Sequence, residues 1–214
     1  MSNKLTGRAA RDNADIQENV ADIEQAVLQG KSVVSSMLGY ARTDEAGGGP
    51  TEAGAVVEEV VSLLSKEFLA GLALTLEVNR HTASVSVSRG QLEQILLNLI
   101  VNASEAMAGR GKLKISLHPA AEIPARPWLL RPDAGAAFVE LRVADSGPGI
   151  PAELHARIFE PFFTTKRVGA KPGTGLGLSL VYAIIQQEKL GLAVESEAGQ
   201  GAIFSVLLPV ADKK

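Results

Sequence analysis

The first hydrophobic pattern in the chain is a seam of apolar and small residues spaced alternately four and three apart. Its members are Ile16, Val20, Ile23, Val27, Gly30, Val34, Met37 and Ala41. This spacing places them on one face of a helix from about Asp12 to Arg42, on the order of 45 Å long. Three glycines and a proline in the segment 43–50 then end the helix. We predict a coiled-coil-like helix that pairs with a second copy of the chain; an amphipathic helix packed on its own domain is the alternative.

Beyond residue 50, helical and period-two patterns alternate along the chain. Leucines alternating with small or polar residues are typical of half-buried strands, and longer stretches with apolar spacings of three and four are typical of helices. The patterns predict strands at 72–79, 83–88, 111–118, 137–145, 193–197 and 202–209, helices at 55–69, 91–107 and 178–187, and a helical turn at 151–159. Ser88 and Gln91 form a capping box that starts helix 91–107. The proline-rich segment 120–135 is expected to be an exposed connection, with a docking loop led by Trp128 as the alternative.

Composition limits the possible classes of protein. The 214 residues suffice for one domain plus an extra element, and the absence of cysteine excludes disulfides, cysteine–zinc sites and thiol nucleophiles. A net charge of −3, with acidic and basic residues interspersed, indicates neither a nucleic-acid nor a membrane partner. The apolar runs are far shorter than a membrane span, and no signal peptide is evident. We expect a soluble, cytoplasmic protein.

Two glycine-rich turns carry the candidate chemistry, VADSGPGIP at 143–151 and KPGTGLGLS at 171–179. In the first, Asp145 ends a predicted strand, and Gly147 and Gly149 turn the backbone so that the carboxylate faces a flat ligand. In the second, alternating glycines place open amide groups beside the start of a helix, where phosphate oxygens bind. Glycines can also occupy turns for backbone reasons alone. The two turns flank a segment, FFTTK at 162–166, that is expected to act as a lid.

A polar stripe lies on helix 91–107. Asn98, Asn102 and Glu105 are four and three residues apart and therefore share one face. Such a stripe can simply be the solvated face of an amphipathic helix. Beside two glycine-rich turns, we interpret it as part of the same site.

These motifs resemble the ATP-binding catalytic domain of sensor histidine kinases, within the superfamily that includes DNA gyrase, Hsp90 and MutL. The resemblance covers about three quarters of the chain, from Thr51 to Pro209. NLIVNASEAM (98–107) resembles the asparagine box, DSGPGI (145–150) and GTGLGL (173–178) the two glycine boxes, FEPFFTTK (159–166) the phenylalanine box, and GQGAIF (199–204) the terminal glycine motif. Ala202 replaces the usual threonine, and EKLG at 188–191 stands where the family often has histidine-glycine-glycine.

The resemblance implies an α+β fold. We expect a two-layer α/β sandwich in which a mixed, mostly antiparallel sheet carries helices on one face, preceded by the long N-terminal helix. The domains are then residues 1–43, the second helix of the dimerisation and phosphotransfer bundle; 44–50, a linker; and 51–214, the ATP-binding catalytic domain.

The implied cofactors are ATP and Mg²⁺. Asp145 would accept the adenine amino group and reject guanine, which offers an oxygen there. Asn102, with Asn98 beside it, would hold Mg²⁺ through amide oxygens, and Lys166 would neutralise phosphate charge. The expected catalytic residues are Asn98, Asn102 and Lys166, and the expected cofactor-binding residues are Asn102, Asp145, Gly147, Gly149, Ile150, Phe159, Thr165, Lys166, Gly173, Thr174, Gly175, Leu176, Gly177 and Leu178.

The phosphoacceptor histidine of the resembled kinases has no counterpart here. His81, His118 and His155 all lack its expected setting, so we interpret the chain as a fragment, or a protein without the first bundle helix, that transfers phosphate to a histidine elsewhere. The resemblance implies a homodimer through the N-terminal helix and a response-regulator receiver domain as partner. Superfamily hydrolases and serine kinases use a glutamate at the place of Asn98, and an amide cannot act as a general base. A serine kinase or ATPase, and a noncatalytic nucleotide-binding module, remain the alternatives.

Overall fold

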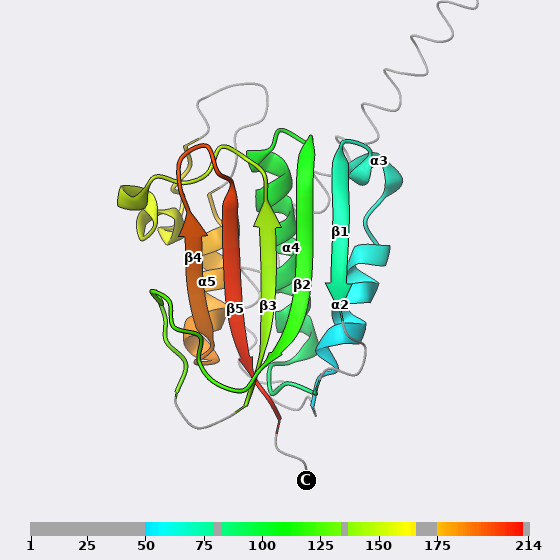
Figure 1. The fold of residues 1–214 in the computed structure, drawn as a ribbon, viewed down its shortest axis with the longest axis vertical. Helices are drawn as coiled ribbons and strands as arrows, with labels where there is room; N and C mark the ends of the chain where they lie inside the picture. The colour runs from blue at the N-terminus through cyan, green and yellow to red at the C-terminus, as the bar shows by residue number, and fades with distance from the viewer. Residues whose placement is uncertain (1–49, 79–82, 134–136, 166–174, 212–214) are drawn as a thin grey trace, which may run out of the picture.

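The computed structural model describes residues 50–78, 83–133, 137–165 and 175–211. Within them, a single sheet carries helices against one face (Figure 1). The elements are α2 (Ala53–Ser62), α3 (Lys66–Leu69), β1 (Leu72–Val78), α4 (Arg89–Ala106), β2 (Gly111–Ala120), β3 (Phe138–Asp145), the 3-10 turns η1 (Ala152–Leu154) and η2 (Arg157–Phe159), α5 (Gly177–Gln187), β4 (Gly191–Ser196) and β5 (Ala202–Pro209). The predicted helix 12–42 and the linker up to residue 49 lie outside the described residues, as does His81.

The sheet is mixed and mostly antiparallel. Its five strands are ordered β1-β2-β3-β5-β4; β1 and β2 pair in parallel, and every other pair is antiparallel. Successive side chains of a strand point to opposite faces. On β3, Val139, Leu141 and Val143 are therefore buried toward the helices, while Glu140 and Arg142 face the other side.

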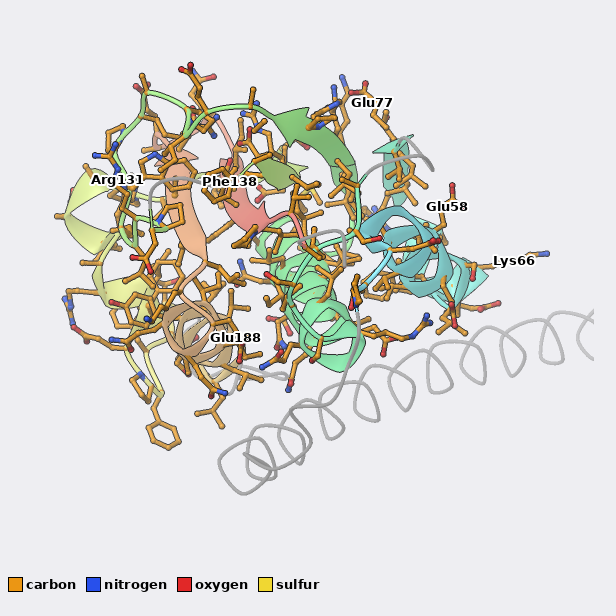
Figure 2. All side chains as sticks on the ribbon, turned by 90° about the horizontal axis from the view of Figure 1, so that it is seen from below. Glu58, Lys66, Glu77, Arg131, Phe138 and Glu188 are labelled. Carbon is orange, nitrogen blue, oxygen red and sulfur yellow. The ribbon has the colours of Figure 1, made fainter. Side chains whose placement is uncertain are left out.

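The core lies between the sheet and three helices, with α4 between α2 and α5. Figure 2 shows the two layers from one end, with Glu77 on the side of the sheet away from the helices. The apolar side of α4 is fully enclosed: Leu92, Ile95, Leu96, Leu99 and Ile100 are each 0% exposed. The helix begins at the predicted capping box. The backbone N–H of Gln91 donates to Ser88 Oγ, and the backbone N–H of Ser88 donates to Gln91 Oε1. The expected α+β two-layer fold is confirmed.

Two predicted elements were wrong. The helix expected over 55–69 is interrupted, because α2 ends at Ser62 and the Ser65 hydroxyl accepts the Phe68 N–H at 3.1 Å, which caps the separate helix α3. The strand expected over 83–88 is reduced to isolated bridges from Val85 to Thr51 and Val210. Alternation of apolar and polar residues shows that an extended segment can bury one side, but a strand also needs a neighbouring strand to pair with.

Strand β2 is longer than expected and continues through Pro119 to Ala120, so His118 lies within the strand rather than at its end. Strand β1 ends opposite Leu117. Within the described residues, Pro119 has a partner in β3, Val139.

The segment 121–133 runs against the edge strand β4. The Leu129 N–H donates to the Leu192 carbonyl and the Leu192 N–H to the Leu130 carbonyl, both at 2.8 Å. Arg126 Nη1 lies 2.8 Å from Glu140 Oε1 and 2.9 Å from Glu195 Oε1. The connection is thus fixed to the sheet, although several of its side chains stay exposed. Among the described residues, no helix is long and apolar enough to cross a membrane.

Candidate functional site

Asp145 is the last residue of β3, the central strand of the sheet. The candidate site lies at this end of the strand. Asp145 pairs with Leu113 of β2 and Ala202 of β5, so two ladders fix its backbone. The Gly147 N–H donates to its Oδ1 at 2.8 Å. Burial raises the pKa of Asp145, and the backbone amides of Gly147 and Ala202 oppose that rise only in part. The result is a carboxylate that is half withdrawn from water, where a hydrogen bond to a ligand is stronger than on an open surface.

The first glycine turn packs tightly against its surroundings. A Cβ on Gly147 would lie 2.7 Å from Asp145 Oδ1, so a side chain there would displace the carboxylate. Gly149 has a φ of +71°, and a Cβ there would lie 1.9 Å from the Glu197 carbonyl oxygen. Gly149 is thus required by its contact with the β4–β5 turn. Its predicted role beside a ligand stays a prediction.

Hydrogen bonds join this turn to the β4–β5 hairpin. The Ile150 N–H donates to Ser196 Oγ at 2.8 Å, and that hydroxyl donates to the Gly201 carbonyl at 2.6 Å. His155 Nε2 lies 3.0 Å from the Ile150 carbonyl oxygen. Ile150 is half-buried within this network. The turn that follows Asp145 is therefore held both by the nearby His155 and by the hairpin about 46 residues further along the chain.

The second glycine box is described from Gly175 onward. Gly175 has a φ of +66°, and its carbonyl accepts the Phe162 N–H at 3.0 Å. Leu176 is the residue before α5, and Gly177 and Leu178 begin the helix. The segment after Phe159 and the second glycine box are therefore joined directly. Gly173, Thr174 and Lys166, which the sequence assigns to phosphate binding, lie outside the described residues.

Helix α4 contacts both glycine turns. Near its middle, a Cβ on Gly177 would lie 3.0 Å from Asn98 Oδ1. At its end, a Cβ on Gly147 would lie 3.5 Å from the Ala106 Cβ. The eight residue steps from Asn98 to Ala106 span roughly 12 Å at 1.5 Å per residue. Asn102 is half-buried between these two points, one turn from each.

The asparagine side chains have the atoms that a hard cation needs. Asn98 is buried, and its Nδ2 donates to the Gln94 carbonyl at 2.7 Å, which turns Oδ1 toward Gly177. Amide oxygens suit Mg²⁺, which keeps several waters and binds few protein groups. Among the described residues, no cluster of three His, Cys, Asp or Glu side chains could hold a metal ion. A cation here would depend on amide oxygens and on oxygens of its ligand.

The aromatic residues of the phenylalanine box differ in their environments. Phe159 is buried, with ring centroids 5.5 Å from Tyr182 and 6.5 Å from Phe204. Phe163 is half-buried, and the Arg157 guanidinium lies 4.9 Å from its ring centroid. Phe162 is 74% exposed, with a φ of +65°. Phe159 therefore packs in the core, whereas the Phe162 side chain is exposed and does not fix the segment 162–165 in place. Thr165 is also exposed and is the last described residue of this segment.

Sequence reasoning missed the residues that support the site from behind. The Ser146 hydroxyl accepts the Lys112 N–H at 2.8 Å, which ties the first glycine turn to the start of β2. A serine directly after Asp145 was a visible signal for such a turn contact. Ser196 offered no local signal, because it accepts the Ile150 N–H from 46 residues away in the sequence. His155 contacts the carbonyl only five residues before it, and no motif marked that contact.

Comparisons with known proteins identify relatives of this chain. Residues 87–212 match the family described as histidine kinase-, DNA gyrase B-, and HSP90-like ATPase. Sensor kinase CckA of Brucella abortus (strain 2308) is 35% identical over 193 residues, covering 89% of this chain and 20% of CckA. The sensory histidine kinase/phosphatase NtrB of Rhodobacter capsulatus is 42% identical over 126 residues, covering 58% and 33%. This chain thus spans a third or less of the length of these two relatives.

Solved structures show the same fold. Full-length ShkA in complex with AMPPNP aligns with a TM-score of 0.65 and 27% identity, covering 90% of this chain and 38% of that chain. Histidine kinase ThkA in complex with the response regulator protein TrrA aligns with a TM-score of 0.64 and 25% identity, covering 92% and 52%.

Proposed function

This chain belongs to the histidine kinase-, DNA gyrase B-, and HSP90-like ATPase family, and on that basis we propose that it is the ATP-binding catalytic portion of a two-component sensor histidine kinase. It transfers the γ-phosphate of ATP to a histidine that this chain does not carry, for relay to a response regulator. The observation that supports this most is the placement of α4. Its asparagines lie between a glycine turn that begins after a half-buried carboxylate and a glycine box that opens a helix.

Asp145 selects the base in this proposal. Its carboxylate accepts the exocyclic amino group of adenine, whereas guanine would present an oxygen and leave a buried acceptor unpaired. The Gly147 N–H donates to Oδ1, so the carboxylate is already held in one orientation before the base binds. Preorganisation of this kind lowers the entropic cost of binding.

The phosphate end lies toward Asn98 and α5. Amide groups at Gly175 and Gly177 lie at the start of α5, where the helix dipole favours negative charge. The predicted contributions of Thr165, Lys166, Gly173 and Thr174 complete this end. Asn102 and Asn98 hold Mg²⁺ through amide oxygens. Bound ATP supplies the phosphoryl group, and the chain contributes mainly position and charge neutralisation.

The residue at position 98 argues for a histidine acceptor. An amide cannot take a proton from water or from a serine hydroxyl at neutral pH. A neutral imidazole carries a nucleophilic lone pair and needs no such base. A serine kinase or an ATPase of the same superfamily is the competing function.

Partners follow from the same proposal. The apolar seam over residues 12–42 pairs with a second copy of the chain, which makes the protein a homodimer. A receiver domain accepts the phosphate from the histidine in this proposal; histidine kinase ThkA forms a complex with the response regulator protein TrrA, which supports a partner of that class. The cellular location of such a module is the cytoplasm.

Phosphotransfer to a supplied acceptor tests the function. The chain is incubated with ATP labelled at the γ-phosphate, Mg²⁺ and a helical hairpin that bears a histidine, with and without EDTA. Acid-labile label on the hairpin that needs Mg²⁺ is the expected result. Steady phosphate release without labelled hairpin would indicate an ATPase, and nucleotide binding without turnover would indicate a regulatory module.

A further inference from the structure

A side-chain contact joins the start of α4 to the end of α5, at the far end of both helices from Asp145. Gln91 Nε2 donates to Glu188 Oε1 at 2.6 Å, between residues 97 positions apart. Both side chains are half-buried. Figure 2, seen from below, shows Glu188 at the end of α5 beside the start of α4.

The Gln91 side chain is held at both of its ends. Its Oε1 accepts the Ser88 N–H at 3.3 Å and the Ser88 hydroxyl at 2.7 Å, while its Nε2 reaches Glu188. A capping-box residue normally serves only its own helix. Here the same side chain also binds a second helix, and its orientation is fixed before that contact forms.

Glu188 carries a negative charge at the C-terminus of α5, where the helix dipole disfavours negative charge. A carboxylate at a helix C-terminus opposes the negative end of the dipole, and the last turn of α5 contains no basic residue. The first turn of α4 contains no acidic residue, so Glu188 supplies negative charge where that helix favours it. The position of Glu188 is therefore explained by α4 rather than by α5.

The backbone after Glu188 keeps it in place. The Leu190 N–H donates to the Ile185 carbonyl at 2.9 Å and the Lys189 N–H to the Gln186 carbonyl at 3.3 Å, with Lys189 at a φ of +53°. These two bonds form a Schellman motif, which ends the helix at a defined residue. Glu188 is thus presented to Gln91 from a rigid helix end.

Helices α4 and α5 run antiparallel, so the start of α5 lies at the opposite end from Glu188, toward the candidate site (Figure 1). Gly177, the first residue of α5, approaches Asn98 so closely that an added Cβ would lie 3.0 Å from Asn98 Oδ1. Between these two contacts both helices contribute buried apolar side chains to the core, Ile95 from α4 and Val181 and Ile184 from α5. Packed helices of this kind move as rigid bodies, so a shift at one end is transmitted to the other.

We propose that Gln91 and Glu188 form a positioning clasp that sets the distance between α5 and Asn98, and thereby the affinity of the site for nucleotide with Mg²⁺. This inference rests on the proposed nucleotide-binding function. Neither residue touches the ligand; both act through the placement of Gly177 and Asn98.

A charge swap tests the clasp. Gln91→Glu keeps the capping box, because glutamate accepts from Ser88 equally well, but it faces Glu188 with a second carboxylate. We expect the dissociation constant of ADP with Mg²⁺ to rise roughly tenfold, measured by titration calorimetry on the full chain at pH 8. Glu188→Gln alone should leave it within about threefold. The double variant, Gln91→Glu with Glu188→Gln, places an amide donor at position 188 opposite a carboxylate acceptor at position 91. It should recover wild-type affinity. Gln186→Glu, which adds a charge at the same helix end, is the matched control.

Two further measurements separate positioning from stability. The ratio of variant to wild-type affinity for Gln91→Glu should approach one at pH 5, where the paired carboxylates share a proton. If Gln91→Glu does not fold, Glu188→Ala removes the clasp without repulsion and should weaken binding roughly threefold. Variants that lose thermal stability but bind nucleotide like the wild type well below their melting temperature would overturn the clasp. A wild-type chain that binds no nucleotide would instead overturn the proposed function.

Discussion

Replacement of Asp145 by asparagine tests the base-binding end of the site with little disturbance of the fold. Asparagine keeps an oxygen that can accept the Gly147 N–H, which now donates to Oδ1 at 2.8 Å. Its other atom becomes an NH₂ group that faces the amino group of adenine, donor against donor. The substitution therefore removes one interaction and adds an unfavourable one without changing the side-chain volume.

The size of the effect follows from the burial of Asp145. A hydrogen bond to a charged group contributes about 1.5–3 kcal/mol, and an unsatisfied buried donor costs about 1–3 kcal/mol. The two effects together come to about 3–4 kcal/mol, which raises the dissociation constant of ADP at least ~100-fold. Titration calorimetry with ADP and Mg²⁺ measures it. Asp133→Asn, the same change at an exposed position of the segment 121–133, is the matched control.

The stability of the same variant should move in the other direction. Burial raises the pKa of Asp145, so the folded protein disfavours the carboxylate. Such a group contributes stability below its unfolded pKa and loses it as the pH rises through the folded pKa. At pH 7 the neutral asparagine should therefore leave the melting temperature equal or higher. An affinity within threefold of wild type, or a clear loss of stability at pH 7, would refute this reasoning about Asp145.

Acidification gives an independent test of Asp145, since nucleotide affinity should fall as its carboxylate takes up a proton, at a higher pH than for an ordinary aspartate; a profile that is flat down to pH 4 contradicts this. Gly177→Ala should raise the helix propensity of α5 by up to about 1 kcal/mol yet weaken nucleotide binding in the presence of Mg²⁺, because the new Cβ lies 3.0 Å from Asn98 Oδ1; calorimetry and thermal melting together check both parts. Ala108→Gly should stabilise the fold by about 1 kcal/mol, as measured by urea unfolding, because Ala108 has a φ of +51° after the end of α4 and glycine adopts this conformation without strain. Arg126→Ala removes the partner 2.8 Å from the buried Glu140 and leaves Arg142 at 3.9 Å; it should lower the free energy of unfolding by about 3 kcal/mol, measured by urea unfolding, with nucleotide affinity unchanged.

Local patterns predicted most of the fold because they depend on short-range physics. The capping box of Ser88 and Gln91, strand β1 and strand β3 follow from spacing and side-chain type within one segment. The prediction failed at Ser65 and at residues 83–88. The Ser65 cap is a local contact over three residues that the apolar spacing of a single long helix overlooked. The strand at 83–88 failed for another reason, because strand formation depends on which segments lie beside it in space.

The candidate site divides in the same way. Asp145, the two glycine turns and the asparagine stripe could be recognised from the sequence, because each motif requires particular residue types at fixed spacing. The roles of Gly149 and Phe159 could not. The first is required by the Glu197 carbonyl and the second by the Tyr182 ring, and both contacts cross between segments far apart in the chain.

The sequence by itself determined which residue types stand at each position of the site: a carboxylate at the end of a strand, amides one helical turn apart, and glycines beside a helix start. The tertiary structure decided how far apart they lie. Helix α4 meets one glycine turn at Ala106 and the other at Asn98, and its contact with Glu188 joins its far end to α5. Residue type is a property of the chain, whereas these distances arise only when sheet, helices and turns pack together around one core.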